Sequence, residues 1–229
     1  TESDLKQAEI TTRDIDRGSF PHFFLKEISQ SAVSVRKTLL GKYRVSRSNS
    51  RPEISFNLGD DVLPARVRQG LKSGEIRSIV LIGHGTAAVA GAAVADGIQR
   101  YLQGSGVKVA ARRASELSGF FMGSDLRDTL VIPVTQSGTT TDTNRAVAMA
   151  AERGASIIAI VNRRQSDITH RADGVFYTSD GRDIEMSVAS TKAFYSQIIA
   201  GHILGLALAG LLGTLSEDAL SEELLRLEQ

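Results

Sequence analysis

The stretch 129–146 constrains the fold most. Its pattern is that of a buried strand followed by a hydroxyl-rich loop and then by a helix. The apolar run 130–134 stops at a cluster of hydroxyl side chains, and an alanine-rich helical pattern, 146–151, follows directly. A solid apolar run is typical of a strand covered on both faces, so the stretch predicts a βα unit inside a larger sheet. Six hydroxyls lie within nine positions: Thr135, Ser137, Thr139, Thr140, Thr141 and Thr143.

The loop 135–140 predicts a site for a phosphate group. The first amides of a helix lack partners and carry the positive end of its dipole, and short hydroxyls beside them add donors. Gly138 allows the chain to turn tightly there. Ordinary helix capping and turn formation would account for one or two hydroxyls, but not for six. The loop has no Walker lysine, which disfavours a nucleoside triphosphate.

Strand and helix patterns alternate from residue 76 onward. Such alternation is typical of a parallel sheet with helices on both faces, so we expect an α/β fold. A long apolar segment, 187–212, closes this unit. The expected strands are 78–82, 107–111, 130–134, 156–161 and 174–177, and the expected helices between them are 86–102, 141–153 and 167–171.

The remaining segments show weaker patterns. We expect a linker at 1–21 and a helix at 22–40, where apolar residues have near-helical spacing. The basic, serine-rich segment 43–57 predicts a mobile loop with a short strand at its end. A helix is expected at 60–72, with Pro64 in its first turn where proline is tolerated, and another at 216–229.

Composition excludes several classes of protein. The chain of 229 residues is 41% hydrophobic, enough for a full core, and its net charge of +1 gives no reason to bind nucleic acid or an anionic membrane. It has no cysteine, which excludes disulfides, cysteine-ligated metals and a cysteine nucleophile. The apolar run 198–212 is too short to span a bilayer and contains His202 and three glycines, so we expect a buried core helix. A cytoplasmic protein without metal or cofactor is therefore expected.

Two further strand ends matter, because ligands of parallel α/β sheets bind beyond the carboxyl ends of the strands. The segment 83–87 has two glycines and places Thr86 at the next helix start, but its glycine spacing does not match the Rossmann pattern. The segment 187–192 places hydroxyls at Ser190 and Thr191 where the long helix begins, and a plain N-cap is enough to explain these. Each segment alone is a weak signal.

Taken together, these segments resemble the isomerase part of glutamine–fructose-6-phosphate aminotransferase, and in particular its first sugar-isomerase (SIS) domain. The residues 188–194, Val-Ala-Ser-Thr-Lys-Ala-Phe, match a family motif without a change. Gln-Ser-Gly at 136–138, with Thr140, Asp142 and Thr143, matches most of a second motif. The turn at 85–86 and the segment 14–28 resemble a Gly-Thr turn of the family and its linker from the glutaminase domain.

The resemblance implies a three-layer αβα sandwich with a five-stranded parallel sheet in flavodoxin-like order, preceded by N-terminal helices. There are departures from the family pattern: His84 stands for a cysteine, Ala87 for a serine that touches the ligand, and Thr139 for a glutamate. The resemblance implies that the sugar phosphate is held by Thr135, Gln136, Ser137, Gly138 and Thr140, and that the sugar is lined by Thr86, Val188 and Ser190.

The resemblance also divides the chain into a linker at 1–21 from an N-terminal domain, an SIS domain at 22–215, and a helical extension at 216–229 toward a second SIS domain. It implies that a homodimer binds fructose 6-phosphate or glucosamine 6-phosphate in amino-sugar biosynthesis. The family's isomerisation residues belong to the second SIS domain, so we expect binding without turnover and assign no catalytic residue. Two alternatives stay open: a stand-alone phosphosugar isomerase with His84 or Glu185 as base, and a sugar-phosphate-sensing module without chemistry.

Overall fold

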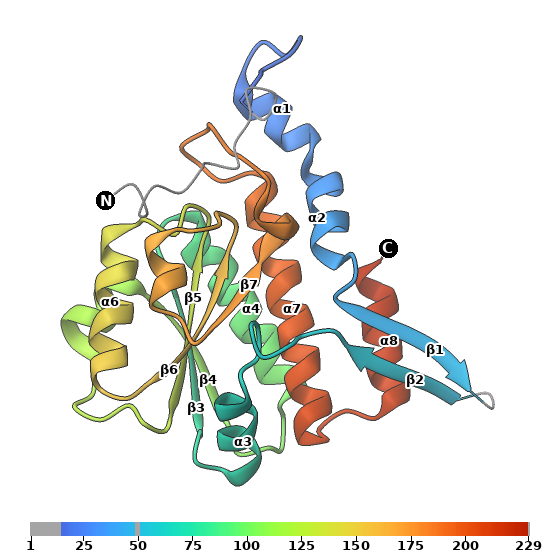
Figure 1. Ribbon diagram of the computed structural model, residues 1–229, viewed down its shortest axis with the longest axis vertical. Helices are drawn as coiled ribbons and strands as arrows, with labels where there is room; N and C mark the ends of the chain where they lie inside the picture. The colour runs from blue at the N-terminus through green and yellow to red at the C-terminus, as the bar shows by residue number, and fades with distance from the viewer. Residues whose placement is uncertain (1–14, 49–50, 229) are drawn as a thin grey trace, which may run out of the picture.

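The centre of the molecule is a five-stranded parallel sheet with the strand order β4-β3-β5-β6-β7 (Figure 1). The computed structural model describes residues 15–48 and 51–228, so most of the expected linker lies outside the described residues. In chain order the sheet reads 2-1-3-4-5, which confirms the expected flavodoxin-like order. The strands are β3 (Ser78–Gly83), β4 (Lys108–Arg113), β5 (Thr129–Thr135), β6 (Ser156–Val161) and β7 (Gly174–Tyr177).

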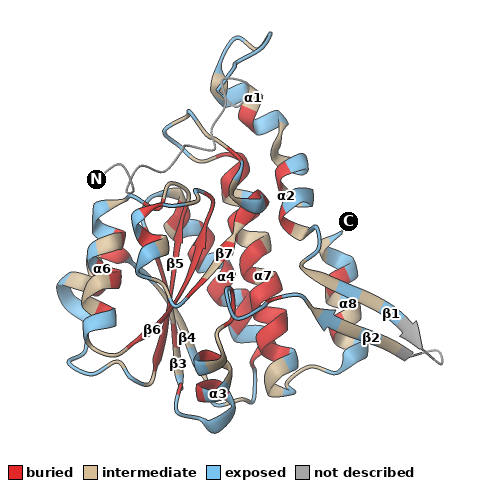
Figure 2. Cartoon of the chain, in the orientation of Figure 1, coloured by how far each residue is buried: buried red, intermediate tan, exposed pale blue. Residues whose placement is uncertain are grey.

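Side chains of the strands alternate between two apolar cores, one on each face of the sheet. Along β5, Leu130 and Ile132 belong to one core, whereas Val131 belongs to the other. The first core lies under α3 (Ala65–Ser73), α4 (Thr86–Tyr101) and α7 (Lys192–Leu212), and the second lies under α6 (Thr141–Glu152). In Figure 2 the central strands β5 and β6 are buried along their whole length, whereas the edge strand β4 is only partly covered. The three-layer αβα architecture is therefore confirmed.

The helices α4 and α7 pack closely because glycines lie at their contact. A Cβ atom on Gly201 would lie 2.9 Å from Cβ of Val94, and one on Gly97 would lie 2.6 Å from Cε1 of His202. By length and composition α7 could cross a membrane, but 61% of its most apolar window is buried inside the fold. The expected core helix at 198–212 is confirmed as the second half of α7.

The N-terminal part packs against α7 on the side away from the sheet (Figure 1). The expected helix at 22–40 is two helices, α1 (Phe23–Ser29) and α2 (Ser31–Leu39), which meet at Gln30. The short strand expected at the end of 43–57 is β2 (Arg51–Phe56), but the loop expected before it is wrong, because β1 (Tyr43–Ser48) pairs with β2 in an antiparallel hairpin. The apolar residues of the hairpin alternate with polar ones and pack against the core beside α8 (Glu217–Leu227).

Two further differences concern a helix boundary and two short helical elements. The helix α3 begins at Ala65, directly after Pro64, and not at residue 60. The sequence patterns did not predict the short helix α5 (Ala114–Glu116) and the π-helical turn at Leu117–Phe121 that follows it. A single helical turn has too few residues for an apolar period to appear, so it escapes a reading based on periodicity.

Candidate functional site

The loop between β5 and α6 is closed by its own side chains. The buried Thr135 accepts a hydrogen bond at Oγ1 from the Gly138 N–H at 3.2 Å, and Ser137 Oγ accepts one from the Thr139 N–H at 3.3 Å. The amide of Asn144 donates to the carbonyl oxygens of Gly138 and Thr140 at 3.0 and 3.2 Å. The loop therefore has one preferred shape before any ligand arrives.

Gly138 is required at its position by both conformation and space. Its φ angle is +66°, a region that side-chain-bearing residues rarely adopt. A Cβ atom there would lie 2.6 Å from Cβ of Ser166, which is closer than carbon atoms approach. The Gly138 carbonyl also accepts a hydrogen bond from the Ile168 N–H at 3.2 Å. Packing against the segment after β6 thus fixes the turn that presents Ser137 and Thr140.

The first turn of α6 offers free donors. Thr140 is the N-cap residue, and no side chain caps the helix start. Within the described chain, the buried Oγ1 atom of Thr143 has no hydrogen-bond partner. Uncapped amides at the positive end of a twelve-residue helix attract an anion. Asp142 in the same turn is exposed and would oppose this attraction unless it points away from the ligand.

The turn after β3 lies beside this loop, because β3 and β5 are neighbours with Ile82 opposite Pro133. His84 Nε2 lies 4.0 Å from Asp142 Oδ2 in the first turn of α6, so the two segments approach each other at this edge. Gly85 has φ +57°, and Thr86, the first residue of α4, is half-buried. The structure thus brings Thr86 and the loop 135–140 to one edge of the sheet, as expected from the sequence.

The third segment, 182–191, has no regular secondary structure and precedes α7. It lies at the same end of the molecule as the carboxyl ends of the strands (Figure 1). Val188 is fully exposed at its outer part and Ser190 is half-buried. No hydrogen bond among the described residues joins either of them to the loop 135–140. Their place at this edge is established, but their contact with a shared ligand stays a prediction.

Glu185 anchors the start of α7 through one carboxylate oxygen, while the other, Oε2, is buried without a partner among the described residues. Its Oε1 atom accepts hydrogen bonds from the Thr191 N–H at 2.8 Å, the Thr191 hydroxyl at 2.9 Å and the Ala193 N–H at 3.1 Å. A carboxylate at this place neutralises helix amides that would otherwise lack partners. This geometry favours the structural role over the catalytic alternative for Glu185.

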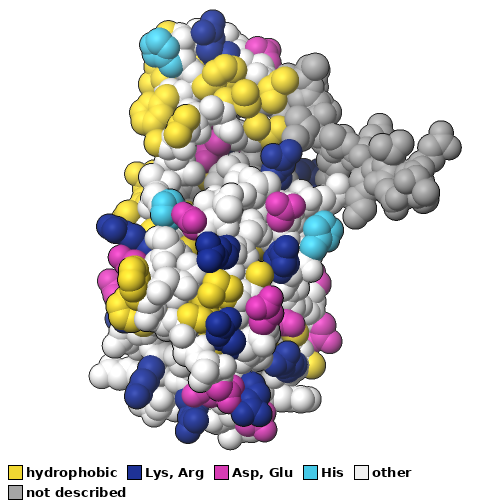
Figure 3. Space-filling model, turned by 90° about the vertical axis from the view of Figure 1, so that its left-hand side faces the viewer, with side chains coloured by type: hydrophobic (Ala, Val, Ile, Leu, Met, Phe, Trp, Pro, Cys, Tyr) yellow, Lys and Arg dark blue, Asp and Glu magenta, His cyan; other side chains and the backbone are white. Residues whose placement is uncertain are grey.

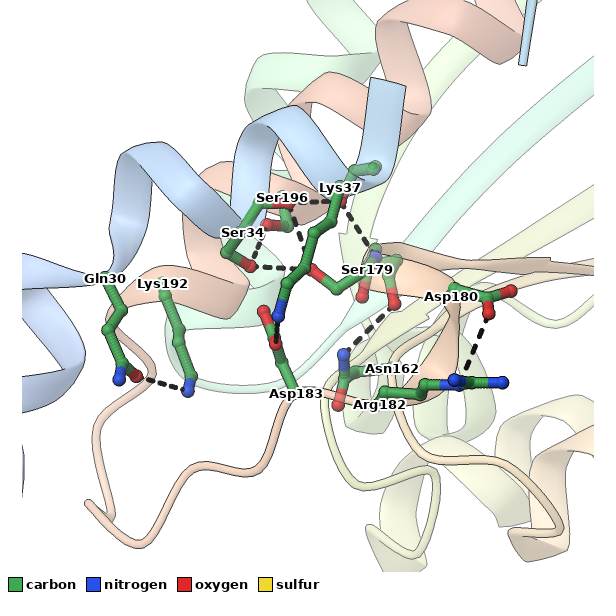
Figure 4. A network of polar contacts seen from close by, with 12 residues as sticks. Gln30, Ser34, Lys37, Asn162, Ser179, Asp180, Arg182, Asp183, Lys192 and Ser196 are labelled. Atoms are coloured by element: carbon green, nitrogen blue, oxygen red, sulfur yellow. Dashed lines mark hydrogen bonds and ion pairs between the residues drawn. The ribbon is translucent and has the colours of Figure 1, made fainter. Parts of the chain in front are cut away.

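A buried polar network joins α2 to the segments around the site (Figure 4). The Ser34 hydroxyl lies 2.7 Å from the hydroxyls of Ser179 and Ser196, and Lys37 forms an ion pair with Asp183 at 3.0 Å. Burial alone would raise the pKa of Asp183, but hydrogen bonds from Ser34, Ser179 and Lys37 lower it overall. The charged form of Asp183 is therefore favoured at neutral pH.

Lys192 is buried at the start of α7 and donates to Oε1 of Gln30 at 2.9 Å. Burial lowers its pKa, and the negative charges of Asp183, Glu185 and Glu27 oppose this shift. Glu27 lies in the segment 14–28 that resembles the family's linker, which assigned it no role, and it accepts two amide hydrogen bonds from the segment 182–191. Local sequence patterns do not reveal these contacts, because the partners of Glu27 lie about 160 positions away.

A cavity of about 580 Å³ lies elsewhere, at the amino ends of the strands. Its charged rim contains three arginines and three carboxylates, and two of these arginines, Arg77 and Arg127, already pair with carboxylates. Ligands of parallel sheets bind at the opposite edge, so we do not assign this cavity to the site. The described residues contain no group of three or more potential metal ligands.

Comparison with known proteins agrees with this geometry. Residues 75–207 match the sequence model of the SIS domain. The chain is 35% identical over 213 residues to glutamine–fructose-6-phosphate aminotransferase of Mycobacterium bovis, covering 93% of this chain and 31% of that protein. It is also 35% identical to the corresponding Corynebacterium diphtheriae protein over 206 residues, covering 89% of this chain and 30% of the relative. The chain therefore spans about a third of the length of these relatives.

Solved structures share the fold. The C-terminal domain of glucosamine-fructose-6-phosphate aminotransferase from Francisella tularensis superposes with a TM-score of 0.76 at 24% identity, covering 93% of this chain and 54% of that one. Glucosamine-6-phosphate deaminase from Thermotoga maritima gives 0.62 at 16% identity, covering 89% and 52%. The sheet order, the segments gathered at its carboxyl edge and the match over 75–207 lead to one conclusion: the chain belongs to the SIS domain family.

Proposed function

We propose that this chain is a sugar-phosphate-binding domain whose phosphate site is the loop between β5 and α6. One observation carries the proposal: a preformed loop of hydroxyls around Gly138 leads into an uncapped helix start. The phosphate would be bound by Thr135, Gln136, Ser137, Gly138 and Thr140, and the sugar would contact Thr86, Val188 and Ser190.

The similarity to the aminotransferases supports a more specific proposal. The whole protein would be a cytoplasmic glutamine–fructose-6-phosphate aminotransferase or a close paralogue, acting in amino-sugar biosynthesis on fructose 6-phosphate. The segment 1–21 would be a linker, 22–215 the phosphosugar-binding domain and 216–229 the extension toward a second such domain. The replacement of a ligand-contacting serine by Ala87 removes one hydroxyl from the proposed sugar pocket.

The double substitution Ser137→Ala/Thr140→Ala is expected to weaken binding of fructose 6-phosphate roughly 30-fold, because two neutral hydrogen bonds contribute about 1 kcal/mol each. Titration calorimetry of wild type and variant measures the difference. The matched control is Thr141→Ala, which removes an exposed hydroxyl of the same helix turn outside the proposed contact set. Equal affinities of wild type and double variant would overturn the phosphate assignment.

A second candidate function, that of a stand-alone phosphosugar isomerase, is favoured by one observation. The exposed pair of His84 and Asp142 lies at the edge of the proposed site, where a histidine could move a proton. We nevertheless expect this chain to bind fructose 6-phosphate without converting it to glucose 6-phosphate, because the family resemblance places the isomerisation residues in a second SIS domain. A dehydrogenase-coupled assay at micromolar protein decides the matter. Saturable turnover that His84→Ala abolishes would establish the isomerase instead.

We propose further that the chain forms a homodimer. Phe24, Leu25 and Ile28 on α1, and Val33 on α2, are all exposed by about half. Figure 3 shows hydrophobic side chains gathered at the upper end of the molecule, over α1. Apolar groups of this kind tend to be covered by a partner, and two-fold dimers are the commonest arrangement. Light scattering at tens of micromolar is expected to give twice the chain mass, and a monomer mass would contradict this.

A further inference from the structure

The carboxylate of Glu27 is buried at the meeting point of α1 and the segment 182–191. Its side chain is 2% exposed, although a carboxylate is costly to bury without partners. Its partners are two main-chain amides: the Met186 N–H at 2.6 Å and the Ser187 N–H at 3.3 Å. Charge-assisted bonds of this kind are stronger than bonds between neutral groups. Glu27 thus fixes the backbone of a segment that has no regular structure of its own.

The same segment is fixed at its other end by Glu185, which holds the amides of Thr191 and Ala193. Between the two carboxylates lie the residues 186–190, here named the anchored loop. Its outer part presents the fully exposed Val188, while the Ser187 hydroxyl inside it is buried without a partner in the described chain. An apolar side chain held outward on a fixed backbone is suited to meet a ligand and adds nothing to the core.

Further contacts attach α1 and α2 to the segments beside the anchored loop. Gln30 accepts from Lys192, and Lys37 pairs with Asp183, so both flanks of the loop are tied to the helical pair (Figure 4). These helices precede the region 75–207 that matches the SIS domain. The region matched by the family therefore does not include the elements that hold one of its proposed sugar-contacting loops.

We propose that Glu27 is a positioning residue that holds the anchored loop in place for the sugar half of the ligand, while the loop 135–140 holds the phosphate half. The inference rests on the proposed function, because Val188 and Ser190 contact the sugar only if that function is correct. It adds that sugar binding depends on α1, through one buried carboxylate. Loss of Glu27 is then expected to affect only one half of the site. The phosphate-binding loop keeps its geometry, whereas the sugar-contacting loop loses it.

The first test needs no ligand. Glu27→Ala is expected to increase hydrogen exchange at the Met186 and Ser187 amides at least tenfold, because both amides lose their acceptor. Glu27→Gln, which keeps one carbonyl oxygen, is expected to give a smaller increase. Ser29→Ala on the same helix removes only a local bond to the Lys26 carbonyl and is the matched control. Unchanged exchange in Glu27→Ala, with the fold intact, would overturn the positioning role.

The second test compares two ligands that share a phosphate ester. Fructose 6-phosphate carries a complete sugar for the anchored loop to contact, whereas glycerol 3-phosphate has only a three-carbon chain and lacks most of the hydroxyls of the sugar. Glu27→Ala is expected to lower the affinity for fructose 6-phosphate about tenfold and the affinity for glycerol 3-phosphate less than twofold. The affinity of Glu27→Gln for fructose 6-phosphate is expected to lie between those of wild type and Glu27→Ala. A merely structural role of Glu27 would lower the affinity for both ligands equally. Equal losses of affinity, or no loss for either ligand, would therefore overturn the inference.

If the proposed function itself is wrong, the result differs from the result expected when only the role of Glu27 is wrong. In that case Ser137→Ala/Thr140→Ala leaves the affinity for both ligands unchanged, or wild type binds neither of them. The exchange experiment would still report whether Glu27 holds the anchored loop. A positive exchange result with no binding would confirm the contact and overturn its role in sugar binding.

Discussion

Gly138→Ala is expected to lower the affinity for fructose 6-phosphate at least ~100-fold, a larger loss than removal of two hydroxyls. The φ angle of +66° alone disfavours a side chain by about 1–2 kcal/mol. The added methyl would also overlap Ser166 and crowd Ile168, which have carbon atoms 2.6 and 3.1 Å from the place that the methyl would take. The loop must then move, and its donors no longer converge on one point. Titration calorimetry, together with a melting curve, measures the effect.

Two controls separate the backbone effect from the steric effect. Gly104 also has a positive φ, +87°, but nothing lies within 4 Å of an added Cβ, so Gly104→Ala is expected to leave the affinity unchanged. Gly138→Ala/Ser166→Gly removes the closest overlap and is expected to regain part of the lost affinity. If Gly138→Ala bound the sugar phosphate as tightly as wild type, the loop geometry would not be needed for binding.

The sheet could be predicted because its strands carry their signal locally. Both β5 and β6 are buried along their whole length, and a strand buried on both faces is a nearly continuous apolar run, interrupted here only at the strand ends by Thr129, Thr135 and Ser156. The predicted limits of β6 and β7 agree with the structure, and those of the other strands differ by one or two residues. The strand order could not follow from these patterns alone, and it was implied by the family resemblance.

The hairpin β1–β2 escaped prediction because its signal is weak. Its apolar positions, such as Val45 and Ile54, alternate with arginines and serines that are typical of loops. What stabilises the hairpin is packing against α8 and the core beside it, a contact between segments far apart in the sequence. Tertiary packing of this kind overrides the local tendency of a polar segment to stay irregular.

The candidate site divides in the same way. The hydroxyls of the loop 135–140 and the turn at Thr86 are visible in the sequence because they follow apolar runs directly. The anchored loop was found as a helix start and through its family motif. Of its two supports, Glu185 was named in the sequence as a candidate base, and Glu27 was given no role. Glu27 and Glu185 are acidic residues like many others until the fold brings them to the backbone amides that they hold. Such positioning residues depend on tertiary structure, which no local pattern encodes.

Gly201→Ala is expected to lower the free energy of unfolding by about 2–3 kcal/mol, although alanine normally stabilises a helix interior relative to glycine by about 1 kcal/mol. The added methyl would meet Val94 of α4, whose Cβ lies 2.9 Å from the place that the methyl would take and whose own methyl groups lie closer still. Close-packed helices cannot absorb such an overlap without moving apart. Chemical denaturation followed by circular dichroism measures the change.

Gly210→Ala provides the matched control in the same helix, because the nearest atom to its added Cβ is Leu220 Cδ1 at 3.4 Å, an ordinary contact. This variant is expected to be as stable as wild type or more stable by up to about 1 kcal/mol. In Val94→Ala/Gly201→Ala the two changes compensate in volume, so the double variant is expected to be more stable than the sum of the single effects predicts, by at least ~1 kcal/mol. Strict additivity would mean that α4 and α7 do not meet at these two residues, and it would contradict the close packing of the two helices.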